Sequence, residues 1–264
     1  MLTLGFIGTG NMGGALAQAA AKNENNRLLL ANRHPEKAQR LREKIGGELT
    51  DSRSAAAKAD YIFLGVKPQM LEALFAEIRD TLSARTDRFV LVSMAAGTSI
   101  EKIRQLAGGD YPVIRIMPNT PVSIGEGMFL YACSKELRQE EKNAFLEAMA
   151  AAGRFSPLEE KLIDAGSAVS GCGPAFVDLF IEALADGGVA CGLPRAQALE
   201  FAAQMTAGSA RLILESGRHP GELKDAVCSP GGTTIQGVRA LEEAGFRAAV
   251  MNAVIAAYEK NFKL

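Results

Sequence analysis

The sequence predicts an α/β fold in which a parallel sheet fills the N-terminal part and helices alone form the C-terminal part. Up to about residue 158, short apolar runs alternate with helical stretches, a pattern typical of a sheet covered by helices on both faces. Beyond that point the strand pattern stops. Pro174 and Pro194 stand where first-turn prolines belong and Gly217 stands where a helix ends, so helices are expected there.

The first predicted domain covers residues 1–158. Its apolar runs predict buried strands over residues 2–7, 27–31, 61–66, 89–93 and 113–117. The stretches between them predict helices over residues 12–22, 35–45, 68–82 and 100–106. Three further segments, at residues 129–133, 136–151 and 154–157, are expected to close this domain.

The second predicted domain covers residues 159–264 and is all-helical. Helices are expected over residues 159–168, 174–191, 194–216, 234–243 and 246–261. The sequence contains no repeat and no low-complexity linker. We therefore expect the chain to pass directly from strand to helix near Leu158.

Charge and hydropathy limit the partners of the chain. Lys and Arg number 29 against 30 Asp and Glu, and a net charge of -1 argues against nucleic acid or an anionic membrane as the main partner. The most apolar long segment, residues 165–192, is interrupted by Asp178, Glu182 and Asp186, so we expect a helix buried in protein and not a membrane span. No secretion-signal pattern is recognised, and the expected location is the cytoplasm.

The cysteine and histidine pattern predicts neither a disulfide framework nor a metal site. Cys133, Cys172, Cys191 and Cys228 form no CxxC pair, and the two histidines lie far apart in the sequence. Metal-binding cysteines and histidines usually recur at short, fixed spacings. The four thiols are therefore expected to be reduced and mostly buried.

The motif GTGNMG at residues 8–13 closes the first predicted strand and opens the first predicted helix. In this context Gly8 allows a tight turn, Gly10 lets the backbone approach a pyrophosphate, and Gly13 lets the helix pack close to the sheet. The motif predicts a Rossmann-type dinucleotide-binding domain. The alternative is a glycine-rich turn that holds no nucleotide. The expected cofactor contacts in this segment are Ile7, Gly8, Gly10, Asn11 and Met12.

The end of the second predicted strand indicates which dinucleotide is bound. NAD-preferring sites place an acid there for the ribose 2′-hydroxyl, but this chain has Asn32 and Arg33. An acid would repel a 2′-phosphate, whereas arginine offers it a planar, charged set of donors. We expect NADPH to be the cofactor, with NADH possible but weaker, and Asn32 and Arg33 to contact it. The alternative for Arg33 is a solvated surface charge.

Two further loops follow predicted strands, at the sheet edge where ligands of open α/β folds bind. One contains Val66, Lys67 and Pro68, and the other contains Ala95 and Ala96. We expect these five residues to contact the cofactor as well.

The segment SPGGTT at residues 229–234 predicts a turn that leads into a helix. A helix that begins on Gly-Gly-Thr-Thr leaves several backbone N–H groups open at its N-terminus, with two hydroxyls among them. Such an end can bind a small carboxylate. The alternative is an ordinary capped helix after a glycine-rich loop.

The string PGELKDAVCSPGGTTIQGVRALE at residues 220–242 resembles the C-terminal signature of the pyrroline-5-carboxylate reductase family. The segments VKP at 66–68, AAG at 95–97, MPNTP at 117–121 and SGCGPA at 170–175 resemble further family segments in the same order. Ser52, Ala226 and Cys172 depart from residues common in the family, which affects the expected cofactor affinity and not the reaction class.

The resemblance implies hydride transfer from NAD(P)H to the imine carbon of 1-pyrroline-5-carboxylate, which gives L-proline in the last step of proline biosynthesis. It implies that the hydroxyl of Thr234 lies beside the ring nitrogen as the catalytic contact. The implied substrate-binding residues are Ser229, Gly231, Gly232, Thr233 and Glu160. The alternative for Glu160 is a solvated acid at a helix start.

The helical part also predicts a homodimer. It is rich in alanine and glycine, and residues 174–191 carry few charges, so a single layer of such helices cannot cover its own apolar face. The alternative is that the N-terminal domain covers this face within one chain. The resemblance implies interlocked helical domains, with dimers joined into larger rings, up to a decamer.

Two other function classes would share part of this sequence pattern. A β-hydroxyacid dehydrogenase also joins a Rossmann domain to a helical domain, but it needs a helical lysine, and residues 165–194 contain none. An NADPH-binding sensor or assembly protein would not need the Gly-Gly-Thr-Thr turn. Both classes are disfavoured on these grounds.

Overall fold

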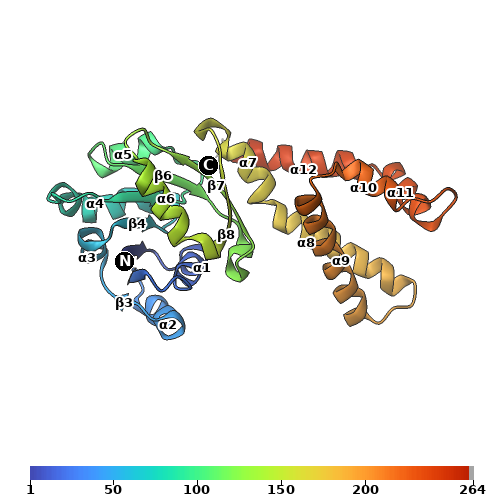
Figure 1. Cartoon of the computed structure of the whole chain (residues 1–264), viewed down its shortest axis with the longest axis horizontal. Coiled ribbons are helices and arrows are strands. Elements are labelled where there is room, and N and C mark those ends of the chain that lie inside the picture. Colours follow the sequence, from blue (N-terminus) through green and yellow to red (C-terminus); the bar gives the residue numbers. More distant parts are fainter. Residues whose placement is uncertain (262–264) are drawn as a thin grey trace. The chain divides into compact units, whose positions relative to one another are not determined.

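The computed structural model describes residues 1–261 and divides into two compact units (Figure 1). Among the described residues, the first unit contains 1–171 and 258–261, and the second contains 172–257. The last strand ends at Pro157, next to the predicted domain boundary at residue 158. By its contacts, however, the chain from residue 158 to Gly171 belongs to the first unit.

The first unit is built on an eight-stranded sheet with the order β3-β2-β1-β4-β5-β6-β7-β8. Neighbouring strands are parallel except for β6 and β7, which are antiparallel. The strands are β1 (Leu2–Ile7), β2 (Asn26–Ala31), β3 (Glu48–Leu49), β4 (Tyr61–Leu64), β5 (Val90–Ser93), β6 (Val113–Met117), β7 (Gly127–Cys133) and β8 (Gly153–Pro157).

Helices cover both faces of this sheet, as Figure 1 shows. The core on one face includes residues of α3, α4 and α5, and the core on the other includes residues of α1, α2 and α6. The helices are α1 (Asn11–Ala20), α2 (Pro35–Ile45), α3 (Ser52–Lys58), α4 (Leu71–Ser83), α5 (Ile100–Ala107), α6 (Gln139–Ala148) and α7 (Ile163–Ser170). The short 3₁₀ helices are η1 (Pro68–Met70), η2 (Thr120–Ile124), η3 (Ala150–Ala152) and η4 (Glu160–Leu162).

Burial on both faces explains why the strands are continuous apolar runs. In β2, Leu28 and Leu30 enter the core on one face, while Leu29 and Ala31 enter the core on the other. A strand that is covered on both faces has no position left for a solvated polar side chain. The predicted strands and the predicted Rossmann-type fold are confirmed.

Apart from the 3₁₀ helix η2, three elements were not predicted from the sequence. They are β3, which has two residues, and the seven-residue helices α3 and α10 (Pro220–Ala226). Helix α3 is held by a local cap, because the backbone N–H of Ser54 donates to Asp51 Oδ1 at 2.7 Å. Such short elements carry too few apolar positions to show a period.

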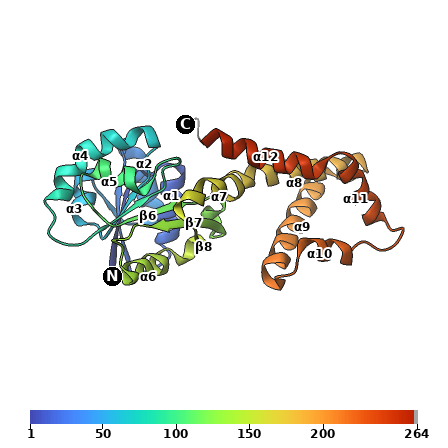
Figure 2. The ribbon, with the colours of Figure 1, turned by 90° about the horizontal axis from the view of Figure 1, so that it is seen from above.

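The second unit consists of α8 (Gly173–Ala190), α9 (Arg195–Ser216), α10, α11 (Thr233–Glu243) and the part of α12 (Phe246–Asn261) up to Ala257 (Figure 2). Pro174 lies in the first turn of α8 as predicted. Pro194 is instead the N-cap of α9, one position before the first turn, because its extended ψ of 139° lies outside the helix. Gly217 ends α9 with a φ of 65°, as predicted.

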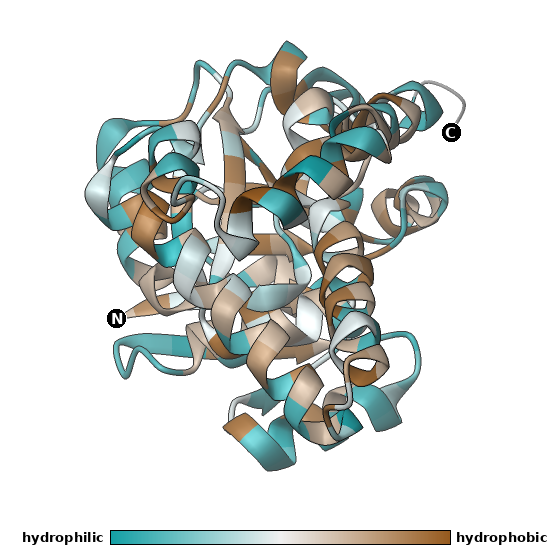
Figure 3. Cartoon of the chain, turned by 90° about the vertical axis from the view of Figure 1, so that its right-hand side faces the viewer, coloured by the Kyte–Doolittle hydropathy of each residue, from teal (hydrophilic) through white to brown (hydrophobic). Residues whose placement is uncertain are grey.

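This helical unit has a very small core of its own. Ala185, Ala198 and Ala202 are the buried residues of 172–257, and they pack α8 against α9. Many large apolar side chains are exposed in the single chain, and hydrophobic stretches run along the helices in Figure 3. The segment 160–190 is long and apolar enough to cross a membrane by length and composition, with 11% of its most apolar window buried.

Candidate active site

The glycine loop between β1 and α1 has the geometry that its sequence predicts. Gly8 has a φ of +100°, and a Cβ on it would lie 2.6 Å from the carbonyl carbon of Gly65. A Cβ on Gly13 would lie 2.1 Å from the Gly8 carbonyl oxygen, so α1 packs against this loop without a side chain between them. A Cβ on Gly10 would meet nothing within 4 Å. The first and third glycines therefore allow close packing, and the middle one keeps the backbone accessible.

The start of α1 can bind an anion. Gly10 is its N-cap, and no side chain caps the helix, so the first backbone N–H groups keep their donors for a ligand. Asn11 and Met12 form the first helical positions. These open donors beside an unobstructed Gly10 fit the pyrophosphate of a dinucleotide.

Asn32 connects this loop to the end of β2. Its Oδ1 accepts a hydrogen bond from the backbone N–H of Thr9 at 3.0 Å, and its Nδ2 donates to the carbonyl oxygen of His34 at 2.9 Å. Both ends of the amide are thus used to hold two loops together. Arg33 is exposed beside it, with its charge free to meet a ligand.

A cavity of about 450 Å³ lies next to the glycine loop. Five of the predicted cofactor residues line it: Ile7, Gly8, Asn32, Arg33 and Val66. The remaining lining residues are Asp51, Ser52, Met70, Ala73, Leu74 and Glu77. Of these, only Ser52 was connected with the cofactor from the sequence. All six come from the start of α3 and from η1 and α4, which carry no recognisable motif.

The other predicted cofactor residues lie at the same edge of the sheet. Lys67 and Pro68 follow β4, and Ala95 and Ala96 follow β5. The register pairs β1 with β4 and β4 with β5, so these loops start beside the end of β1. Ala95 is buried and Ala96 half-buried, whereas Lys67 and Pro68 are exposed.

A buried arginine connects β6 to the chain after β8. Arg115 has a side chain only 4% exposed, and its Nη2 donates to Asp164 Oδ1 at 2.7 Å. Its Nη1 lies 3.6 Å from Glu160 Oε1, which also accepts from the backbone N–H of Ile100 at 2.6 Å. The observed contacts of Glu160 thus hold α5 and β6 to η4. A substrate contact for Glu160 stays a prediction.

The predicted SPGGTT turn is present in the second unit, between α10 and α11 (Figure 2). The backbone N–H of Gly232 donates to the carbonyl oxygen of Ser229 at 3.0 Å, and Gly231 has a φ of +70°. Helix α11 begins at Thr233 with Gly232 as N-cap, and no side chain caps it. Thr233 and Thr234 are exposed, so their backbone donors and hydroxyls are accessible to a ligand.

No metal site is assembled in the part of the chain that the structure describes. Residues 1–261 contain no group of three or more His, Cys, Asp or Glu side chains that could hold an ion. All four cysteines are free thiols, but the expectation that they are mostly buried is wrong, because Cys133, Cys172 and Cys228 are half-buried and Cys191 is exposed in the single chain. Partial burial raises the pKa of the Cys133 thiol.

The strand–glycine loop–helix geometry, the uncapped start of α1 and the adjoining cavity define an NAD(P)-binding oxidoreductase of the Rossmann class. Residues 3–97 match the family model described as NADP oxidoreductase coenzyme F420-dependent. Residues 160–264 match the model described as pyrroline-5-carboxylate reductase dimerisation.

Similar proteins extend the match to the whole chain. The pyrroline-5-carboxylate reductase of Escherichia coli is 40% identical over 99% of this chain and 97% of its own length. That of Glycine max is 39% identical over 99% of this chain and 96% of its own. The chain therefore belongs to the pyrroline-5-carboxylate reductase family, as the sequence resemblance implied.

Solved structures agree with this assignment. The Plasmodium falciparum pyrroline carboxylate reductase with NADP bound has a TM-score of 0.87 and 33% identity, covering 98% of this chain and 97% of its own. The Coxiella burnetii pyrroline-5-carboxylate reductase has a TM-score of 0.90 and 31% identity, covering 99% and 98%. These relatives favour this family over the β-hydroxyacid dehydrogenases.

The last glycine of the motif, Gly13, should respond differently to substitution from the middle one, Gly10. We expect Gly13→Ala to lower the free energy of unfolding by about 1–3 kcal/mol, because its Cβ would overlap the Gly8 carbonyl oxygen. Gly10→Ala should keep nearly wild-type stability, since Gly10 has a φ of −70° and open space around it. Its affinity for the dinucleotide should fall about tenfold because the methyl group takes up space at the phosphate. Urea unfolding and fluorescence titration measure the two effects, and equal dinucleotide affinity in Gly10→Ala and wild type would contradict the assignment.

Proposed function

We propose that this protein reduces 1-pyrroline-5-carboxylate to L-proline, the last step of proline biosynthesis, with NADPH as the preferred cofactor. The uncapped SPGGTT helix start carries the proposal, because it offers a carboxylate site in the part of the chain matched to the reductase family. The reaction adds a hydride to the imine carbon and leaves a proton on the ring nitrogen. The dinucleotide, when bound, supplies the hydride.

The second unit would bind and orient the substrate. The Gly231-Gly232-Thr233 backbone holds the carboxylate through the N–H groups of Gly231 and Thr233, because that of Gly232 already donates to the carbonyl oxygen of Ser229. The hydroxyl of Ser229 lies beside them. The hydroxyl of Thr234 hydrogen-bonds the ring nitrogen. A protonated imine is already an electrophile, so fixing its position and orientation is the main task of these residues.

The preference for NADPH rests on the end of β2. Arg33 stands there in place of an acid, and its side chain lines the dinucleotide cavity. A guanidinium can pair with a 2′-phosphate through two hydrogen bonds. NADH has no 2′-phosphate and cannot form this pair.

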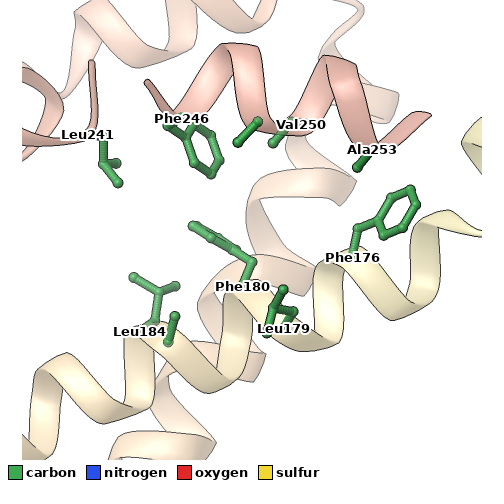
Figure 4. Close-up of a pocket in the computed structure, with 10 residues that line it drawn as sticks. Phe176, Leu179, Phe180, Leu184, Leu241, Phe246, Val250 and Ala253 are labelled. Atoms are coloured by element: carbon green, nitrogen blue, oxygen red, sulfur yellow. The ribbon is translucent and has the colours of Figure 1, made fainter. Parts of the chain in front are cut away.

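The exposed apolar surface of the second unit supports a homodimer. A groove of about 400 Å³ lies between α8 and the α11–α12 segment, and its walls are almost entirely apolar (Figure 4). Phe180 and Phe246 face each other across it with ring centroids 5.9 Å apart. A second copy of the chain would remove this surface from water, and assembly of dimers into a decamer is a further part of the proposal.

The exposed apolar surface of the helices also bears on where in the cell the enzyme is located. The segment 160–190 lies inside the match to the dimerisation family, so its exposed apolar side chains are explained by subunit contacts. We therefore place the enzyme in the cytoplasm and not in a membrane.

The central test is turnover of the purified protein with racemic pyrroline-5-carboxylate. We expect oxidation of NADPH, followed by its absorbance, together with formation of L-proline in equal amount. NADPH oxidation without proline formation, or no oxidation at all, would overturn the proposed function.

Arg33 should set the choice between the two cofactors. We expect wild type to have a higher kcat/KM with NADPH than with NADH, and Arg33→Ala to lower the NADPH value about tenfold or more while leaving the NADH value nearly unchanged. Arg40→Ala, which removes an exposed arginine of α2 that does not line the cavity, is the control. A preference for NADH that Arg33→Ala does not alter would remove Arg33 from the site.

Thr234 should act in the chemical step. Thr234→Ala should lower kcat about ten- to a hundredfold, because one hydrogen bond in the transition state contributes roughly 1–3 kcal/mol. The dissociation constant for NADPH should change little. Gln236→Ala, an exposed position of the same helix, is the control. Activity within a factor of two of wild type would reduce Thr234 to a role in starting the helix.

The protein should sediment as a dimer or larger at both micromolar and nanomolar concentrations. Phe180→Glu should shift it toward monomer and lower its activity, because the change places a charge in the apolar groove. Ile124→Glu, at a residue 73% exposed in the first unit, should sediment as wild type does. An active wild-type monomer of 27.9 kDa at both concentrations would contradict the homodimer.

A further inference from the structure

The dinucleotide cavity has an apolar wall that phosphate binding does not explain. Met70, Ala73 and Leu74 contribute it from the end of η1 and the start of α4. Glu77 lines the same cavity four residues after Ala73, so both side chains lie on one face of α4. The wall therefore ends in a carboxylate.

This carboxylate is unexpected in a site for a cofactor that carries several negative phosphates. The other acid in the cavity, Asp51, has a structural role. Its Oδ1 and Oδ2 accept from the backbone N–H and the Oγ of Ser54 at 2.7 and 3.0 Å, and the backbone hydrogen bond lowers the pKa of the Asp51 carboxyl. Across residues 1–261, no hydrogen bond or ion pair engages the carboxylate of Glu77. The side chain of Arg53 contacts Glu77 at its main-chain carbonyl oxygen, with Nε at 3.2 Å, and not at its carboxylate.

The position of the apolar wall relative to Asn32 and Arg33 indicates which part of a dinucleotide contacts it. Asn32 and Arg33 line the cavity from the end of β2, where the ribose of the adenosine half binds in this fold. The ring next to that ribose is adenine. Adenine has apolar faces and an exocyclic amino group with two N–H donors. Ribose hydroxyls and phosphates lack the flat apolar face that would match Met70 and Leu74.

We propose that Glu77 recognises the adenine base of the cofactor by accepting a hydrogen bond from its 6-amino group, while Met70, Ala73 and Leu74 pack against the ring. The inference rests on the proposed NADPH-dependent function and adds a residue that determines specificity for the base. An ionised carboxylate can only accept hydrogen bonds. A base with a 6-oxo group in place of the amine would set its own acceptor oxygen against the carboxylate oxygen, and no hydrogen bond can form between these two atoms.

The test compares NADPH with its hypoxanthine analogue, in which an oxygen replaces the 6-amino group. Dissociation constants are measured by fluorescence titration of the full chain, without substrate. Wild type should bind NADPH about tenfold more tightly than the analogue, since a site built for a donor group rejects a ligand that lacks it. Glu77→Gln should reduce this ratio to about twofold or less, because its amide can rotate to donate to the 6-oxo group.

Glu72→Gln is the matched control, because Glu72 is an exposed acid of the same helix that does not line the cavity. It should keep the tenfold ratio, and its kcat with saturating NADPH should be unchanged. Equal binding of the two cofactors by wild type, or an unchanged ratio in Glu77→Gln, would overturn the proposal. A protein that discriminates as expected but does not reduce pyrroline-5-carboxylate would disprove the proposed reaction and leave the base recognition standing.

Discussion

The close approach of backbone segments at the ends of β1 and β4 is the constraint on which the dinucleotide site depends. A Cβ on Gly65 would lie 2.2 Å from the carbonyl oxygen of Gly8, and a Cβ on Gly13 would lie 2.1 Å from the same atom. Side chains at these positions would separate the strands or push α1 away from the sheet. The open start of α1 and the cavity beside it exist because Gly13 and Gly65 converge on the carbonyl group of Gly8.

Sequence reasoning predicted the parts of the fold that repeat a simple pattern. The strands were recognisable because burial on both faces leaves them uniformly apolar, and the glycine loop because its spacing follows from steric needs. The antiparallel direction of β7 and the existence of α3 were not recognisable. Strand direction is set by contacts across the sheet, and α3 depends on the cap from Asp51 more than on any apolar period.

The same distinction separates the residues of the candidate site that could be predicted from those that could not. Residues on motif loops, such as Gly8 and Arg33, could be named from the sequence. Met70 and Glu77 could not, because they belong to η1 and α4, whose position beside the end of β2 is set by the order of strands in the sheet. Glu160 was named from family resemblance alone. Its contacts with Ile100 and Arg115 join residues far apart in the chain, which local patterns do not report.

The Arg115 contacts also determine how the dinucleotide-binding part could be excised. A fragment that stopped at residue 158 would keep Arg115 in the sheet but lose Glu160 and Asp164, which leaves a guanidinium 4% exposed without a counter-ion. An uncompensated charge of this kind costs about 3–5 kcal/mol. A fragment that stopped at Gly171 would keep both carboxylates. It would also keep the carbonyl oxygen of Ser170, to which Asn119 Nδ2 donates at 3.0 Å. Whether the N-terminal half can fold by itself therefore depends on the thirteen residues 159–171, which follow its last strand. All but the first of them lie inside the match to the dimerisation family.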